Sequence, residues 1–178
     1  MGISVIIDQK KGSTSINKTD KDNIDRAVEL VMEMAKGSQP DEAYDIAEHQ
    51  PPQSFSKGDE SANLDTMYQY LEEFVNYVKS TYSKIQLEAA IMDFNHSKSF
   101  FQNTNGVEFE IREGMYSFSP WFLSKDGEYT SSFNGTGFSA LKVKKPLHEY
   151  GTIDTLLKQS VEQLHTQNIK DKFVGKIV

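Results

Sequence analysis

The four histidines are the side chains best suited to bind a metal ion or to transfer a proton near neutral pH. They lie far apart, at His49, His96, His148 and His165. No two of them stand four residues apart, the spacing that places two imidazoles on one side of a helix around a zinc ion. Glu149 follows His148, but no second histidine completes a zinc-protease motif. We therefore predict ordinary surface roles for all four.

A pair of carboxylates, Glu108 and Glu110, shares one face of an expected strand. Two adjacent carboxylates can perform acid–base catalysis when one of them is desolvated. Because Val107 and Phe109 supply the apolar face, we interpret the glutamates as the solvated side of a sheet. The sequence has no Gly-x-Ser-x-Gly elbow and no cysteine for a nucleophile. Side-chain chemistry alone thus predicts no catalytic, cofactor-binding or metal-binding residue.

Two other groups could bind a ligand. Gly135-Thr136-Gly137 is similar to part of a phosphate-binding loop, but it lacks a third glycine and a Lys-Ser or Lys-Thr pair, so we predict a turn. An aromatic group could stack on nucleic-acid bases or line a peptide groove, although core packing is the simpler interpretation. This group comprises Tyr116, Phe118, Trp121 and Phe122. Stacking on bases is poorly supported because no Arg or Lys lies between these residues.

Composition limits the classes of function. The 178 residues, 37% of them hydrophobic, suffice for the core of one domain. A net charge of −7 argues against broad binding to nucleic acid or an anionic membrane, and the compact basic cluster is limited to Lys142, Lys144 and Lys145. No apolar run near the N-terminus is long enough for a signal peptide or a membrane span. The lack of cysteine fits a cytoplasmic location.

The stretch Phe101 to Leu141 is expected to form the centre of the fold as strand, turn, strand, turn and strand. Alternating apolar and charged residues from 107 to 112 predict a half-buried strand. Asn105-Gly106 and Asp126-Gly127 are typical of tight hairpin turns. The expected strands cover residues 3–8, 13–17, 85–93, 107–112, 116–123 and 128–133. In the strand at 85–93 the alternation breaks at Ala90, as a β-bulge would cause, and residues 96–99 are expected to turn.

Three amphipathic helices are predicted from apolar residues that recur at three and four positions. The first is capped by Thr19 or Asp20 and ends at Lys36-Gly37, the second runs from Asn63 to about Tyr82, and the third follows Thr152. The connector 37–60 is expected on the surface with one helical turn at 41–47, and its length leaves a functional excursion as the alternative. An apolar end at 173–178 suggests a further strand. These elements predict an α+β fold over residues 1–178 as a single domain: a mostly antiparallel sheet with the three helices packed on one face.

Several motifs, taken in order, resemble the TldD/PmbA family, also called the modulator of DNA gyrase family, and its PmbA (TldE-like) branch in particular. The first match runs through Gly2-Ile3-Ser4-Val5, Lys11-Gly12-Ser13-Thr14-Ser15 and a helix that ends Ala35-Lys36-Gly37-Ser38-Gln39-Pro40-Asp41. The second runs through Asn103-Thr104-Asn105-Gly106-Val107, Tyr116-Ser117-Phe118-Ser119 and Lys125-Asp126-Gly127. The resemblance covers most of residues 2 to 165.

The resemblance implies a metallopeptidase system in which TldD-like and PmbA-like chains pair and act on peptides. In such a system one member carries a His-Glu-x-x-x-His zinc motif beyond the N-terminal α+β domain. This sequence contains no such motif. The resemblance therefore transfers no metal ligand or catalytic residue, and zinc is expected only in the partner or in a missing C-terminal domain. We expect the chain to be an N-terminal domain and a fragment, without that C-terminal domain and without the first strands before Gly2.

Two functions follow as hypotheses. The first is a non-catalytic domain that shapes a peptide chamber and contacts a TldD-like or PmbA-like partner subunit in a homo- or hetero-dimer. The alternative is a stand-alone adaptor that binds a peptide or protein along an exposed strand. Direct nucleic-acid binding, suggested by the family's historical name, is not expected at a charge of −7.

Overall fold

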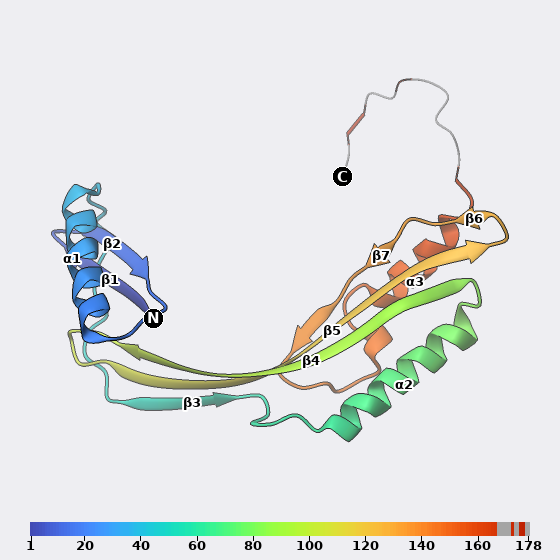
Figure 1. The fold of residues 1–178 in the computed structure, drawn as a ribbon, viewed down its shortest axis with the longest axis horizontal. Coiled ribbons are helices and arrows are strands. Elements are labelled where there is room, and N and C mark those ends of the chain that lie inside the picture. Colours follow the sequence, from blue (N-terminus) through green and yellow to red (C-terminus); the bar gives the residue numbers. More distant parts are fainter. Residues whose placement is uncertain (167–171, 173–174, 177–178) are drawn as a thin grey trace. The chain divides into compact units, whose positions relative to one another are not determined.

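The computed structural model describes residues 1–166, 172 and 175–176 (Figure 1). This part of the chain divides into two compact units. The first contains Met1–Ser54 and Phe100–Glu110, and the second contains Phe55–Ser99 and the described residues from Ile111 onward. The strand expected at 173–178 lies outside the described residues apart from two positions. No helix in the described part is both long and apolar enough to cross a membrane.

The first unit is built on a hairpin of β1 (Gly2–Ile7) and β2 (Lys10–Ser15), in which Gly2 lies opposite Ser15. The strands expected at 3–8 and 13–17 left residues 10–12 for the turn, but the turn lies at Asp8 and Gln9, both with positive φ. The register explains the shift, because it pairs Gly12 with Val5 inside the ladder instead of leaving it in the turn.

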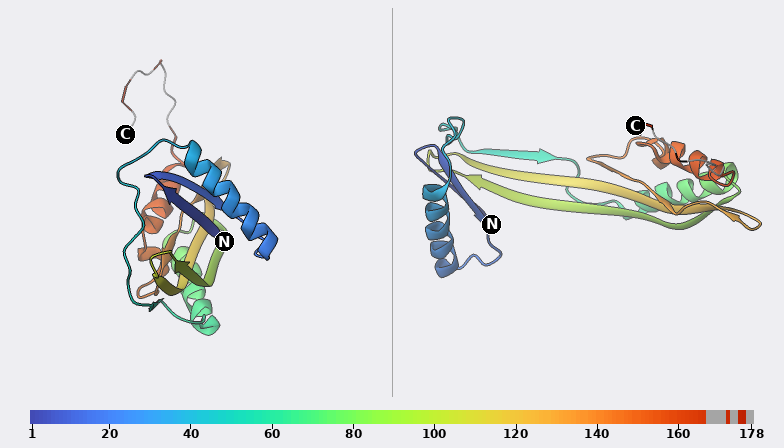
Figure 2. Two further views of the ribbon diagram at one scale, coloured as in Figure 1. Left: turned by 90° about the vertical axis from the view of Figure 1, so that its left-hand side faces the viewer. Right: turned by 90° about the horizontal axis from the view of Figure 1, so that it is seen from above.

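Helix α1 (Lys21–Gly37) packs on this hairpin through its buried residues Ala27, Val31 and Ala35 (Figure 2). The Asp20 side chain caps it by accepting a hydrogen bond from the Asn23 backbone N–H at 3.2 Å. Gly12 permits the contact between the helix and β2, since a Cβ there would overlap the Val31 carbonyl oxygen. The small residues of both elements therefore let the two backbones approach each other closely.

The larger sheet has six strands in the order β3-β5-β4, and β6, β7 and β8 also pair with β5. The strands are β3 (Gln53–Lys57), β4 (Ile85–Gln102), β5 (Glu108–Asp126), β6 (Tyr129–Thr130), β7 (Asn134–Gly135) and β8 (Phe138–Ala140). Between β4 and β5, the Gly106 N–H donates to the Asn103 carbonyl at 3.2 Å, and Gly127 follows β5. Both glycines have positive φ, so the two predicted turns are confirmed.

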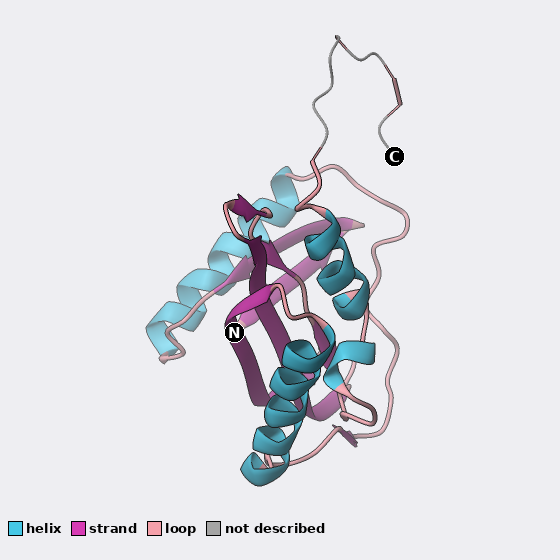
Figure 3. Ribbon diagram, turned by 90° about the vertical axis from the view of Figure 1, so that its right-hand side faces the viewer, coloured by secondary structure: helices cyan, strands magenta, loops and turns pink. Residues whose placement is uncertain are grey.

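The core of the second unit lies between this sheet and two helices, α2 (Leu64–Thr81) and α3 (Ile153–Glu162), with the short 3₁₀ helix η1 (Leu147–Glu149). Figure 3 shows α2 and α3 on the same face of the sheet. Alternate β5 residues are buried there, as the two-residue period of a strand requires. The buried cluster comprises Phe74, Val78, Phe118, Phe122, Leu147, Ile153 and Leu157.

Strand β4 shows the predicted break in alternation. Ile85 and Leu87 pack against the core, and so do Ala90 and Met92, so the inward-facing positions change from odd to even. An extra residue near Ala89, as in a β-bulge, produces such a change.

The α+β class is confirmed, whereas several details are corrected. The strands form two sheets instead of one, and α1 packs on the small hairpin instead of joining α2 and α3. Residues 96–99 continue β4 instead of turning, because all residues from 95 to 102 are exposed and a strand in water tolerates polar residues on both faces. That residues 1–178 form a single domain stays a prediction.

Four further expectations are corrected, two in the strands and two in the connector. The predicted strands 107–112 and 116–123 are one strand, β5, whereas the strand expected at 128–133 shrinks to Tyr129–Thr130. The connector contains strand β3, which was not predicted because all five of its residues are exposed. In place of the helical turn at 41–47, a single turn closes with the Tyr44 N–H donating to the Asp41 carbonyl at 2.9 Å.

Candidate functional site

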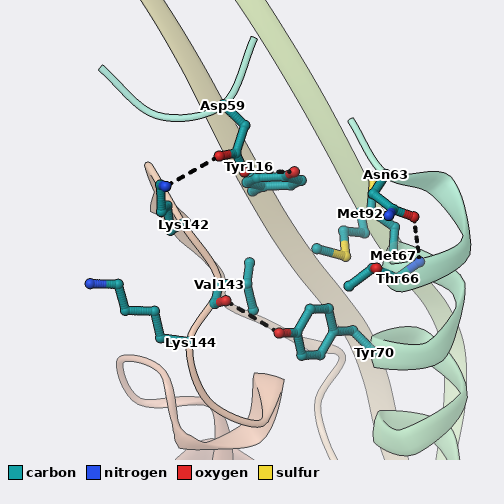
Figure 4. Close-up of a pocket in the computed structure, with 10 residues that line it drawn as sticks. All are labelled: Asp59, Asn63, Thr66, Met67, Tyr70, Met92, Tyr116, Lys142, Val143 and Lys144. Atoms are coloured by element: carbon teal, nitrogen blue, oxygen red, sulfur yellow. Dashed lines mark hydrogen bonds and ion pairs between the residues drawn. The ribbon is translucent and has the colours of Figure 1, made fainter. Parts of the chain in front are cut away.

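A cavity of about 310 Å³ lies in the second unit, between the N-terminal half of α2, the strands β4 and β5, and the segment 142–144 (Figure 4). Sequence reasoning assigned no site here. The residues that line it are Asp59, Asn63, Thr66, Met67, Tyr70, Met92, Tyr116, Lys142, Val143 and Lys144.

Two glycines bring Asp59 to this cavity. Gly58 has a φ of +74°, and a Cβ there would overlap the Gly114 carbonyl oxygen on β5. A Cβ on Gly114 would in turn overlap the Asp59 carbonyl oxygen. Because only glycine fits both positions, the segment before α2 crosses directly over β5 and places the Asp59 carboxylate beside Tyr116.

The Asp59 carboxylate is held between a hydroxyl and an ammonium group, as Figure 4 shows. The Tyr116 hydroxyl donates to Asp59 Oδ2 at 3.2 Å, and Lys142 Nζ lies 3.5 Å from Asp59 Oδ1. Burial raises the pKa of Tyr116, and the hydrogen bond to Asp59 raises it further. Tyr116 therefore stays protonated at neutral pH and serves as a hydrogen-bond donor.

The α2 side of the cavity is fixed by two hydrogen bonds. Asn63 caps the helix, its side-chain oxygen accepting from the Thr66 N–H at 3.1 Å. One turn further along, the Tyr70 hydroxyl donates to the Val143 carbonyl at 3.2 Å and ties the segment 142–144 to the helix. These two hydrogen bonds hold the walls of the cavity in place within the chain itself.

The cavity combines an apolar floor with a charged rim. Met67 and Met92 supply flexible thioether side chains, while Asp59 and Lys142 supply opposite charges, and Figure 4 shows the Lys144 side chain extending away from the cavity. Such a lining suits a small ligand, or a side chain of another protein, with an apolar body and a polar end.

The histidines lie apart from this cavity. His49 Nδ1 lies 3.1 Å from the Asn105 carbonyl oxygen, and the His148 ring stacks on Tyr77 with centroids 3.6 Å apart. His96 and His165 are exposed. Among the described residues no group of three or more His, Asp or Glu side chains is placed to hold a metal ion. That zinc is bound by a partner or by a missing C-terminal domain stays a prediction.

The aromatic group predicted to pack in the core does so in three of four cases. Tyr116, Phe118 and Phe122 are buried. Trp121 is 41% exposed and stacks on Phe133 with ring centroids 5.7 Å apart. Trp121 differs because it points to the face of β5 that α2 and α3 do not cover.

The carboxylate pair and the glycine motif named from the sequence do not form a site. Glu108 is exposed and Glu110 is half-buried. Gly135 ends β7, and the two residues that follow it connect directly to β8, so no helix follows the glycines.

The three lysines of the basic cluster lie in two different places. Lys142 and Lys144 line the cavity, whereas Lys145 donates to the Glu149 carbonyl at 2.7 Å and lies over the Tyr150 ring. The cavity draws on four separate segments, so no spacing in the sequence could have revealed it. The local sequence signal for the cavity was the pair Gly58-Asp59, which lies just before the Asn63 cap of α2.

No protein-family model matches the chain, and no curated protein sequence matches it. Among solved structures, the chain is similar to TldE from Thermococcus kodakarensis, with a TM-score of 0.53 and 14% sequence identity. The match covers 90% of this chain and 36% of that chain, so this chain spans about a third of the length of that TldE. At this identity the likeness concerns the fold. The chain has a TldE/TldD-like fold, in agreement with the motifs found in its sequence.

Proposed function

We propose that this chain is a non-catalytic N-terminal domain of a TldD/PmbA-type metallopeptidase system that acts on peptides. In that role it forms part of the wall of a peptide chamber and contacts a TldD-like or PmbA-like partner subunit. The likeness to TldE across 90% of the chain carries the proposal. Zinc and the catalytic residues would come from the partner or from further sequence of the same protein.

Two features of the second unit support such a role. The cavity beside Asp59 offers a pre-formed place for a side chain of a substrate or partner. Trp121 on β5 and Phe133 just before β7 form a stacked and exposed aromatic pair on the face opposite the helices. Exposed aromatic pairs of this kind are typical of protein–protein contacts.

The test mixes the purified chain with a TldD-like chain that carries the zinc motif. We expect a complex in size-exclusion chromatography, and zinc-dependent cleavage of an unstructured peptide that requires the TldD-like chain. Trp121→Ser should weaken the complex, whereas Tyr129→Ser is the matched control, since Tyr129 is exposed on the terminal hairpin of β5 and β6.

Two results would contradict the proposal. One is robust zinc-dependent peptide hydrolysis by this chain alone. The other is the absence of a complex with both TldD-like and PmbA-like chains under conditions in which circular dichroism shows that the chain is folded.

A further inference from the structure

Strand β4 has an open edge in the second unit. It stands at the end of the strand order β3-β5-β4, so one side pairs with β5, and no strand among the described residues pairs with the other. From Ile85 to Met92 this edge belongs to the second unit. An edge strand presents unpaired N–H and C=O groups and is a template for a further strand.

A groove follows this edge. It has a volume of about 430 Å³ and lies between α2 and β4, which run beside each other in Figure 1. Val75, Val78 and Lys79 line it from α2, and residues of β4 between Ile85 and Ala90 line it from the sheet. The groove is thus walled by a helix on one side and by the open strand edge on the other.

The flank of α2 that faces this groove carries apolar residues that are not buried in the core. Met67, Phe74 and Val78 are the buried residues of the helix. Leu64 and Tyr68 precede Val75 at helical spacing and lie on the same flank of α2. They are 64% and 73% exposed. The exposed apolar flank therefore extends the groove toward the N-terminus of α2.

The charges around the edge are mainly negative. Glu88 and Asp93 alternate with the core-facing residues of β4 and are exposed, Glu88 also lining the groove, and Glu72 is exposed on α2. Lys79, which lines the groove, contributes one positive charge beside these three carboxylates. Lys84, just before β4, is already bound to Asp126 at 2.7 Å. A ligand strand at this edge thus meets an apolar surface on one side and carboxylates on the other.

We propose that the β4 edge binds an extended peptide in which apolar and basic residues alternate. Successive side chains of a strand point to opposite faces, so apolar side chains enter the groove beside Val75 while Lys or Arg side chains lie near Glu88 and Asp93. Main-chain hydrogen bonds to β4 supply affinity, and the two different faces supply specificity. This inference goes beyond the proposed function, because it requires neither a partner subunit nor a metal ion. It also gives the adaptor hypothesis a definite strand and a definite ligand chemistry.

The experiment uses a capped, fluorescently labelled octapeptide of alternating valine and lysine, and a matched peptide of alternating valine and glutamate. Fluorescence anisotropy should show binding of the lysine peptide and at least tenfold weaker binding of the glutamate peptide. Two N-methylated versions test strand pairing. Methyl groups on alternate nitrogens along one edge of the peptide should abolish binding, whereas methyl groups along the other edge should leave it, since only one edge pairs with β4.

Protein variants test the location. The double variant Glu88→Lys/Asp93→Lys should weaken binding of the lysine peptide about tenfold, because two attractive cross-strand contacts become repulsive. Glu73→Lys is the matched control, as Glu73 is exposed on the flank of α2 away from the groove and should leave the affinity unchanged. Amide shifts in NMR spectra should concentrate at Ile85–Met92 and along α2.

The proposal is overturned by equal affinity for both peptides, by equal effects of the two methylation patterns, or by a lysine peptide that fails to bind at millimolar concentration. It is also overturned if sedimentation shows a dimer formed through β4 that the peptide does not dissociate, because the edge would then belong to a second copy of the chain.

Discussion

The Tyr116 hydroxyl donates a hydrogen bond of 3.2 Å to the Asp59 carboxylate, and it joins residues 57 positions apart in the sequence. Tyr116 is only 8% exposed, so its hydroxyl has little access to water as an alternative partner. The bond therefore fixes the segment before α2 onto β5 and forms one wall of the cavity.

Replacing Tyr116 by Phe should lower the free energy of unfolding by about 1 kcal/mol, the net value of one partly buried hydrogen bond. The variant should also change the pH dependence. Because the folded-state pKa of Tyr116 is raised, its contribution to stability is complete below the unfolded pKa near 10 and is lost as the pH rises through the folded pKa. Urea unfolding at pH 8, 10 and 11 should show a shallower loss of stability in Tyr116→Phe. An identical slope in both proteins would contradict the assignment.

Asp154 at the start of α3 binds two tyrosines of the α2 region through one oxygen. Tyr77 and Tyr82 donate to Asp154 Oδ1 at 2.6 and 2.8 Å. Asp154→Ala should lower the free energy of unfolding by ~2 kcal/mol, since two partly buried hydroxyls lose their charged acceptor. Asp154→Asn is the control, because its side-chain oxygen can still accept, and it should recover more than half of the loss in denaturant unfolding.

A polar network anchors the other end of α3. The buried Ser160 hydroxyl lies 3.0 Å from Ser124 Oγ on β5, and it accepts from Asn134 Nδ2 of β7 at 3.1 Å. Ser160→Val adds a methyl group to a fully buried site and removes the hydroxyl that bonds Ser124 Oγ, so we expect a loss of ~2 kcal/mol or more in thermal or urea unfolding. Ser160→Ala should cost less, because it removes the same hydroxyl without adding volume to the buried site. Equal stability of the valine variant and the wild type would show that the network contributes nothing.

The sequence identified those elements whose signals are local. Helix α1 was placed because its apolar stripe, its Asp20 cap and its final Lys36-Gly37 all agree, and the turns at Gly106 and Gly127 follow from local turn chemistry. Strand β3 was missed because all of its residues are exposed and it pairs at the outer side of β5, so no apolar alternation marks it.

The candidate site escaped prediction for a different reason. Its geometry depends on where Gly58 crosses Gly114, which is a contact between distant segments. Tyr116 and Lys142 meet Asp59 only through that crossing. In the sequence, Tyr116 belonged to a run of core aromatics and Lys142 to a basic cluster, so neither pointed to a shared cavity.

Gly12 offers a test of close packing in the first unit. A Cβ at this position would overlap the Val31 carbonyl oxygen and would crowd the backbone nitrogen of Ala35. Both groups belong to the α1 backbone, which cannot move away like a flexible side chain, so Gly12→Ala should displace the helix from β2 at a cost of ~1–3 kcal/mol. Hydrogen exchange of the α1 amides should accelerate accordingly. Gly37→Ala is the matched control, because a Cβ there meets no atom within 4 Å and alanine favours a helix, so it should leave exchange unchanged or slower. If both variants exchanged alike, close approach at Gly12 would not be what holds α1 on the hairpin.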